Sequence, residues 1–232
     1  MKIFAISDLH MSIANPKPMN IFGGKWDNYL DKIAEDWIKK VQEDDVVLIS
    51  GDISWAMNVS DALKDFEYFK ALPGKKIFIR GNHDYWWKGI TNLRDAVPSN
   101  CFLLQNDAIK IENVVFCGSR CWLCPGSPDF KTTDEKLFAR ETERLRLAFH
   151  KAQGLREEGD KLVVLTHYPP FNVRREDNAI TQLIEENCAN AVVYGHLHGR
   201  DSRADKLLVR KGIKYYLASC DLVDNKLVDI EI

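Results

Sequence analysis

The chain contains 232 residues, 45% of them hydrophobic, and carries a formal net charge of −2 at pH 7. This length and composition are typical of one domain with a sizeable core, so we expect residues 1–232 to fold as a single domain. The balanced charge argues against bulk nucleic-acid binding, and no apolar run approaches the roughly 20 residues that cross a bilayer. The opening MKIFAISDLH lacks the layout of a secretory signal, so we expect a cytoplasmic protein with no membrane contact.

Ten runs rich in β-branched residues predict strands, at 2–6, 45–50, 75–80, 101–104, 108–117, 161–166, 191–194, 206–210, 213–219 and 226–231. A helix is predicted by the apolar spacing of Trp26, Leu30, Ile33, Trp37 and Val41, and further helices are expected near 58–71, 86–96, 133–157 and 177–187. Strands and helices alternate in the first half, while the last strands follow one another through short turns. This order predicts mixed sheets with helices outside and a C-terminal antiparallel portion.

The stretch 121–160 departs from this alternation, because a loop with Pro and Gly leads into a long charged helix. It is either a cap over a pocket or a surface helix, and the charge content favours the second interpretation. Thr132 and Glu135 fit a capping box that would start the helix. Cys121 and Cys124 form a single C-x-x-C, which we interpret as reduced, partly buried thiols rather than a zinc or redox site.

The six histidines are unevenly distributed, since all except His150 directly follow predicted strands. They occur in Asp8-Leu9-His10, Gly81-Asn82-His83-Asp84, His167 and Gly195-His196-Leu197-His198, and Gly51-Asp52 follows a fifth strand. Ligands gather beyond the carboxyl ends of strands in alternating sheets, so we expect these side chains to converge on one site. Paired residues two apart would point the same way if the backbone stayed extended. Imidazole and carboxylate suit first-row divalent ions, and seven candidate ligands are enough for two of them.

These five blocks resemble the pattern of the calcineurin-like metallophosphoesterases, which runs D-x-H, G-D, G-N-H-D/E, H and G-H-x-H, and the resemblance spans residues 8 to 198. It implies an α/β fold of the α+β type, a four-layer αββα sandwich of two mixed β-sheets flanked by helices. It also implies a hydrolase that cleaves phosphate esters of a small phosphorylated substrate with a metal-bound hydroxide. Two divalent metal ions would be bound, with Mn²⁺ expected first and Fe, Zn or Co as alternatives.

The resemblance also implies a role for each residue. One metal would be held by Asp8, His10 and His198, the other by Asn82, His167 and His196, and Asp52 would bridge both. His83 would not be a ligand but the general acid, placed to act on the phosphate and the leaving oxygen. His150 is expected to have no role in the site.

Several alternatives remain open in the sequence. The chain has neither the G-D-x-V-D-R-G of Ser/Thr protein phosphatases nor the metal-binding Tyr of purple acid phosphatases, which is replaced by Trp55. A non-catalytic scaffold on the same fold is a second hypothesis, and a phosphodiesterase acting on nucleotides is a third. Asp84 would either orient its loop or cap a helix near Tyr85. The remaining candidates are substrate-contacting or structural side chains: Tyr85, Trp86, Trp87, Trp122, Arg120, Arg174 and Arg175. The oligomeric state stays open.

Overall fold

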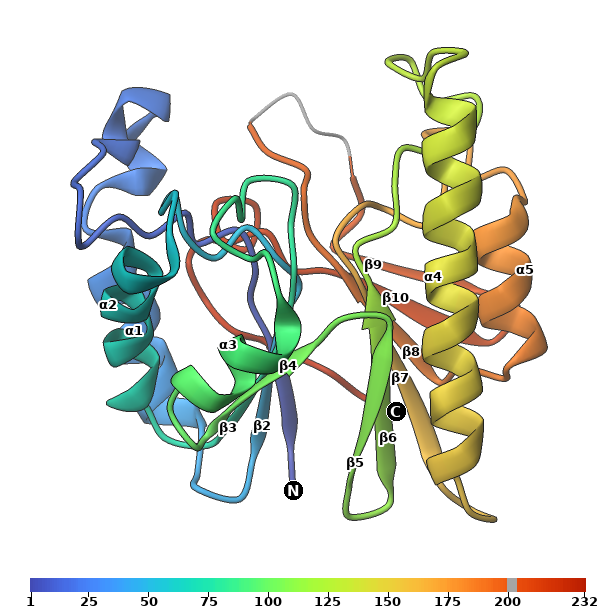
Figure 1. Ribbon diagram of the computed structural model, residues 1–232, viewed down its shortest axis with the longest axis horizontal. Coiled ribbons are helices and arrows are strands. Elements are labelled where there is room, and N and C mark those ends of the chain that lie inside the picture. The colour runs from blue at the N-terminus through green and yellow to red at the C-terminus, as the bar shows by residue number, and fades with distance from the viewer. Residues whose placement is uncertain (200–203) are drawn as a thin grey trace.

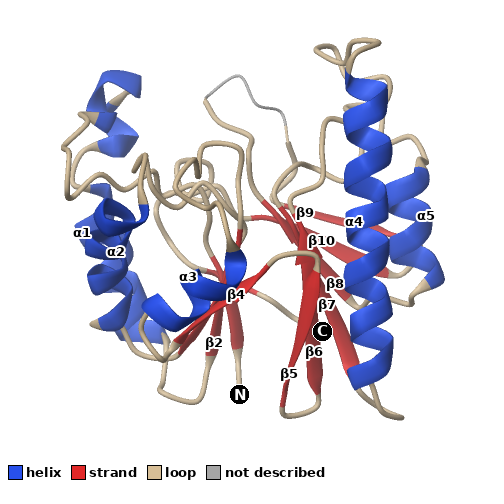
Figure 2. Cartoon of the chain, in the orientation of Figure 1, coloured by secondary structure: helices blue, strands red, loops and turns tan. Residues whose placement is uncertain are grey.

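Two β-sheets lie face to face between two layers of helices in the computed structural model, which describes residues 1–199 and 204–232 (Figures 1 and 2). The first sheet contains, in spatial order, β11 (Val228–Asp229), β1 (Ile3–Ala5), β2 (Val46–Ile49), β3 (Lys75–Ile79) and β4 (Cys101–Leu104). The second contains β5 (Asp107–Ile111), β6 (Val114–Ser119), β7 (Lys161–Thr166), β8 (Ala191–Tyr194), β10 (Ile213–Leu217) and β9 (Leu207–Arg210). Both sheets mix parallel and antiparallel pairs, which confirms the predicted four-layer αββα sandwich.

Helices cover the outer face of each sheet (Figure 2). Those beside the first sheet are α1 (Tyr29–Lys40), α2 (Val59–Lys70) and α3 (Ile90–Ala96), and those beside the second are α4 (Asp134–Leu155) and α5 (Ala179–Glu186). Two short 3-10 helices, η1 (Met19–Phe22) and η2 (Gly24–Trp26), precede α1. Among the described residues, no helix has the length and apolar character that crossing a membrane would need.

Three hydrophobic clusters fill the three interfaces between these four layers. Strand β2 shows how one strand serves two of them, because successive side chains point to opposite faces. Val47 and Ile49 pack with the helices of the first layer, whereas Val46 and Leu48 pack against the second sheet. A strand that is buried on both faces needs a continuous apolar run, which explains why these runs were visible in the sequence.

The C-terminal strands are distributed differently from the prediction. β9 and β10 form the expected antiparallel hairpin through Lys211 and Gly212, but β10 pairs in parallel with β8. β11 crosses to the other sheet, where it pairs antiparallel with β1. The single strand predicted over 108–117 is wrong, because the turn at Glu112 divides it into β5 and β6, which form an antiparallel hairpin.

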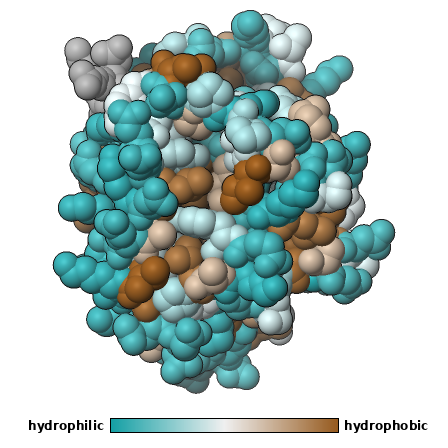
Figure 3. Space-filling view, turned by 90° about the vertical axis from the view of Figure 1, so that its left-hand side faces the viewer, coloured by the Kyte–Doolittle hydropathy of each residue, from teal (hydrophilic) through white to brown (hydrophobic). Residues whose placement is uncertain are grey.

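The segment 121–160 divides into two parts. Its loop leads to α4, which packs on β5 and β6 along the outer face of the second sheet. The predicted capping box is wrong, because the helix begins at Asp134 and its N-cap residue Thr133 makes no side-chain cap hydrogen bond. On the side of α1 and α2, the molecular surface is mostly hydrophilic with apolar side chains scattered among polar ones (Figure 3).

Candidate metal centre

The predicted site residues meet beyond the carboxyl ends of five strands that belong to both sheets. The residues concerned follow β1, β2, β3, β7 and β8 respectively: Asp8, Asp52, Asn82, His167 and His196. Isolated parallel bridges hold neighbouring loops of this edge together, between Ser7 and Ser219 and between Met11 and Ser54. The sequence-based expectation of convergence is therefore matched by the fold.

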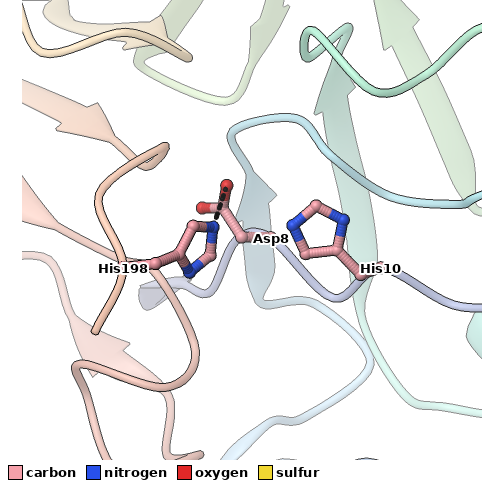
Figure 4. A group of neighbouring side chains, drawn as sticks. All are labelled: Asp8, His10 and His198. Carbon is pink, nitrogen blue, oxygen red and sulfur yellow. Dashed lines mark ion pairs between the residues drawn. The ribbon is translucent and has the colours of Figure 1, made fainter. Parts of the chain in front are cut away.

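A first group of possible ligands contains Asp8, His10 and His198, each with one ligand atom within 4.8 Å of the others. Figure 4 shows the Asp8 carboxylate between the two imidazoles. His198 Nε2 lies 3.5 Å from Asp8 Oδ1. His10 Nε2 lies 3.8 Å from Asp52 Oδ2, which connects this group to the next.

A second group forms around His167, whose side chain is fully buried. Asp8, Asp52 and His167 have ligand atoms within 4.8 Å of one another. His167 Nε2 lies 2.7 Å from Asn82 Oδ1, 3.4 Å from Asp52 Oδ2 and 3.3 Å from His196 Nδ1. Nitrogen and oxygen atoms of four side chains thus lie close together around His167 Nε2. Asp52 also faces His10 of the first group.

The backbone of this site is not extended. Asp8, His10, Asp52 and His196 all have positive φ angles, between 47° and 72°. Non-glycine residues adopt this left-handed conformation rarely, and such residues cluster at functional sites. The assumption of an extended D-x-H and H-x-H was therefore wrong. Instead, the left-handed His196 turns its ring to His167, while that of His198 faces Asp8.

Two glycines leave space for ligand side chains from other loops. A Cβ atom on Gly81 would collide with the carboxylate of Asp52, and one on Gly195 would collide with Asp8 Oδ2. Each glycine belongs to one sequence block, and the carboxylate that it accommodates belongs to another. The blocks therefore fit together as one unit.

Two imidazoles are oriented by groups outside the ligand set. His167 Nδ1 lies 2.8 Å from the Ser50 carbonyl, and His198 Nδ1 lies 2.9 Å from Asp221 Oδ1. Because a carbonyl or carboxylate can only accept a hydrogen bond, Nδ1 donates in both cases and Nε2 is left to face the site. Asp221 also accepts from the Gly199 amide at 2.9 Å. None of the sequence motifs includes Asp221.

Asp84 links two of the site loops. It is fully buried, and its Oδ1 accepts from the amides of Ile53 and Ser54 and from Trp86 Nε1 at 2.9–3.1 Å. Its Oδ2 accepts from the Gly81 amide at 2.7 Å. The chain around Tyr85 is not helical, so Asp84 orients the loops and does not cap a helix.

His83 and Trp55 form one wall of the site. The His83 amide donates to Asp52 Oδ1 at 2.8 Å, so its backbone fixes that carboxylate. The Trp55 ring stacks on His10 with a centroid distance of 4.8 Å and lies 4.7 Å from His83. Lys17 Nζ lies 4.7 Å from the same indole centroid. Trp55 thus covers one face of two imidazoles and does not itself act as a ligand.

Burial and mutual repulsion set the charges of the site. Burial, followed by the charge of Asp8, raises the pKa of Asp52 to about 8. Burial lowers the pKa of His10 and of His196 to about 3, and it also lowers the pKa of His83. Burial alone would lower the pKa of His198, but its contacts with Asp221 and Asp8 raise it to about 10.

The two buried carboxylates and their imidazoles suit divalent cations. Burial would raise the pKa of Asp8, but His198 and the neighbouring imidazoles hold it well below its usual range. Asp8 is thus ionised close to Asp52, whose pKa is raised by burial and by the charge of Asp8. A buried carboxylate pair of this kind is stabilised when cations bind between its members. The donor set, of nitrogen and oxygen atoms, is one that first-row divalent ions accept.

Several aromatic and arginine candidates from the sequence do not belong to the groups of possible metal ligands. Trp86 and Trp87 are buried in the first core cluster, whereas Tyr85 is exposed. Arg174 pairs with Glu176, and Arg175 pairs with Asp205.

The thiols and His150 are likewise separate from the centre. Burial raises the pKa of Cys124 to about 12 and that of Cys121 well above its usual value, which supports their interpretation as buried structural thiols. His150 is exposed on α4.

A pocket of about 700 Å³ opens beside the imidazoles of His196 and His198. Its wall is largely apolar and includes Leu123, Phe171 and Leu208. The loop part of the 121–160 segment therefore borders this pocket.

Buried carboxylates and imidazoles at the common edge of two sheets suit a metal-dependent hydrolase. The family model for calcineurin-like phosphoesterases matches residues 1–200, and the chain belongs to this family. It is a hydrolase that acts on phosphate ester bonds.

Solved structures show the same fold at low sequence identity. The protein TT1561 of Thermus thermophilus is 12% identical, with a TM-score of 0.60 over 99% of this chain and 97% of that one. The protein AQ665 of Aquifex aeolicus, whose function is unknown, is 17% identical, with a TM-score of 0.53 over 98% and 95%. No match was found among curated proteins.

Proposed function

We propose that this protein is a two-metal phosphoesterase for a small phosphorylated substrate, with His83 as general acid. In this proposal Asp8, His10 and His198 hold one divalent ion, Asn82, His167 and His196 hold the other, and Asp52 is shared. The observation that carries it is the position of Asp52 Oδ2, 3.8 Å from His10 Nε2 and 3.4 Å from His167 Nε2. One carboxylate thus faces both groups of candidate ligands.

Each side chain has a defined task in this proposal. When bound, the two ions would activate a water for attack on phosphorus and offset the charge of the phosphate oxygens. Asp52 is held in place by the His83 amide, and His167 by the Ser50 carbonyl. Trp55 covers His10 and His83 and keeps water away from one side of their rings.

His83 supplies the proton chemistry. Its ring lies 5.5 Å from that of His10, and its buried Nδ1 has no hydrogen-bond partner among the described residues. No described residue therefore engages Nδ1, and in our proposal the His83 ring donates to a phosphate oxygen or to the leaving alkoxide. Burial lowers the pKa of His83, so the protonated form becomes more populated at acidic pH. The neutral ring can still donate one hydrogen bond.

The pocket beside His196 and His198 supports a small-molecule substrate, because its volume of about 700 Å³ falls in the range of ligand pockets. Mn²⁺ is the ion we expect first, since the mixed donor set accepts it and Fe, Zn or Co as well. The six free thiols support a cytoplasmic location, and we treat residues 1–232 as one domain.

The scaffold alternative predicts a degraded site, yet all eight proposed site residues are present in this chain. Assays with p-nitrophenyl phosphate and bis-p-nitrophenyl phosphate test the proposal, with Mn²⁺ and after EDTA treatment. We expect hydrolysis that EDTA abolishes and Mn²⁺ restores. Absence of metal-dependent turnover of both compounds would favour the scaffold, and preference for the second compound would favour a phosphodiesterase.

A further inference from the structure

Three arginines surround the buried carboxylate of Glu141. The atoms Arg120 Nη2, Arg140 Nη2 and Arg144 Nη1 lie 3.2, 3.2 and 2.7 Å from the same oxygen, Glu141 Oε1. Only 1% of the Glu141 side chain is exposed, whereas about half of Arg140 and of Arg144 reaches solvent. We call these three arginines the arginine cluster.

Anchoring of α4 explains only one of the three contacts. Arg120 follows β6, so its pair with Glu141 joins the second sheet to the helix. Arg140 and Arg144 lie on α4 itself, as Glu141 does, and their pairs hold no second element in place. A different reason is needed for two additional cations at this point.

The positive charge of the cluster exceeds what its neighbours neutralise. One carboxylate faces three guanidinium groups, which leaves a net charge of +2. The buried Nε atoms of Arg120 and of nearby Arg80 have no hydrogen-bond partner among residues 1–199 and 204–232. Asp134, at the start of the same helix, accepts from Trp122 Nε1 and the Lys131 amide instead. A buried donor without a partner is costly, whereas the half-exposed Arg140 and Arg144 are free to bind an anion from solvent.

The arginine cluster is connected to the candidate metal centre. The Arg120 carbonyl accepts from the amides of His167 and Tyr168, each at 3.1 Å. The Arg120 guanidinium lies 4.9 Å from the Trp122 ring centroid, and that ring lies 5.1 Å from Tyr168. Tyr168 is in turn 4.0 Å from the ring of His196. Two aromatic rings therefore bridge the distance between cluster and centre.

We propose that the arginine cluster binds a second phosphate group, carried by the substrate in addition to the ester phosphate that is hydrolysed. Guanidinium groups match phosphate oxygens with paired hydrogen bonds and keep their charge at all physiological pH values. The substrate class is accordingly a bisphosphate whose two phosphates are separated by a spacer that passes Tyr168 and Trp122. This inference rests on the proposed function, because the metal centre defines where the first phosphate lies.

The first experiment measures binding of inorganic phosphate to EDTA-treated protein by calorimetry, a condition in which the metal centre cannot hold the anion. Arg144→Gln is compared with Arg146→Gln, a matched control on the same helix, since Arg146 pairs with exposed Glu143 and with no other carboxylate in the described part of the chain. Loss of one charge-assisted contact should weaken binding about tenfold or more in the first variant and leave the second unchanged. Arg140→Gln serves as a second variant, and thermal unfolding checks that each is folded.

The phosphate site is refuted if EDTA-treated protein binds no phosphate, or if Arg144→Gln and Arg146→Gln bind it equally well. If Arg144→Gln does not fold, Arg140→Gln takes its place. The Arg140 side chain is half exposed, so we expect its replacement to leave the fold intact.

The second experiment separates a substrate phosphate from a free one. Alkanediol bisphosphates of increasing chain length and matching alkyl monophosphates are compared as inhibitors of p-nitrophenyl phosphate hydrolysis by Mn²⁺-loaded protein. At one spacer length the bisphosphate should bind about tenfold more tightly, and Arg144→Gln should remove that advantage. If no length gives an advantage, the occupant is free phosphate and the assignment to substrate is wrong. A protein that binds phosphate but hydrolyses nothing would instead contradict the proposed function alone.

Discussion

His198 donates a hydrogen bond from Nδ1 to Oδ1 of Asp221 across 2.9 Å, and this contact joins two loops that are separated by 23 residues. Asp221 also accepts from the amide that follows His198, so both the ring and its backbone are fixed by one carboxylate. Carboxylates in this position orient metal-binding imidazoles and raise their basicity.

Removal of this carboxylate should weaken metal binding without unfolding the protein. For Asp221→Ala we expect a loss of roughly 10- to 100-fold in affinity for the ion that we propose Asp8, His10 and His198 hold. Mn²⁺ titration by calorimetry measures it. Asp224→Asn is the control, because among the described residues that exposed carboxylate pairs only with Lys25 and Lys206. Unchanged Mn²⁺ affinity in Asp221→Ala would show that the contact has no influence on the centre.

His83 should affect rate rather than metal content. General acid catalysis contributes typically ~10²- to 10⁴-fold, so His83→Ala should lose about that much in kcat while retaining both ions. His167→Ala should instead lose metal, and His150→Ala should behave as the parent protein. Elemental analysis beside p-nitrophenyl phosphate kinetics distinguishes these outcomes. A His83→Ala protein that lost its ions would identify His83 as a ligand.

Asp84 should be essential for stability. Burial, followed by the charge of Asp52, raises its pKa to about 6, and it remains ionised at pH 7 with four donors around it. In Asp84→Asn the new NH₂ group must face an N–H donor, which costs about 1–3 kcal/mol of unfolding free energy. Urea unfolding of EDTA-treated protein measures the change, with exposed Asp95→Asn as control. Equal stability of both variants would mean that the loops are held by other contacts.

Metal-free protein should lose stability as the pH rises above neutrality. The folded-state pKa values of Asp52 and His198 are raised to about 8 and about 10, so the folded protein retains protons that the unfolded chain releases at lower pH. The stabilisation from these protons is lost as pH rises through those values. His10 and His196, with pKa values of about 3, oppose this trend only below pH 6.5.

The midpoint of thermal unfolding should therefore fall between pH 6.5 and pH 9 after EDTA treatment. Bound ions displace the same protons, so the Mn²⁺-loaded protein should not show the decline. Parallel pH curves for the two forms would contradict the assigned protonation states.

The sandwich could be predicted where local pattern and burial agree. Strands such as β7 and β8 were predicted with their observed bounds because both faces are buried and the run is continuously apolar. Pairing partners depend on long-range contacts, and so the crossing of β11 to β1 was missed. The helix expected from residue 86 begins only at Ile90, because Trp86 and Trp87 insert into the core ahead of it.

That the motif residues meet at one edge of the sheets could be predicted, but the residues that hold them in place could not. Asp221 and Trp55 act through contacts that no spacing in the sequence reveals. The left-handed backbone at Asp8 and His196 was equally hidden, because neither residue type requires that conformation. Asp84 was ambiguous between two roles until its four donors were located.

The glycines of the site determine how this protein can be changed. Gly81 and Gly195 each make room for a carboxylate from a different loop, so an alanine at Gly81 would collide with Asp52. Exchanging a single loop with that of a distant relative would carry the same risk. Chimeras should therefore transfer these loops together. We expect residues that set substrate preference to vary more easily in the pocket wall than at the strand ends.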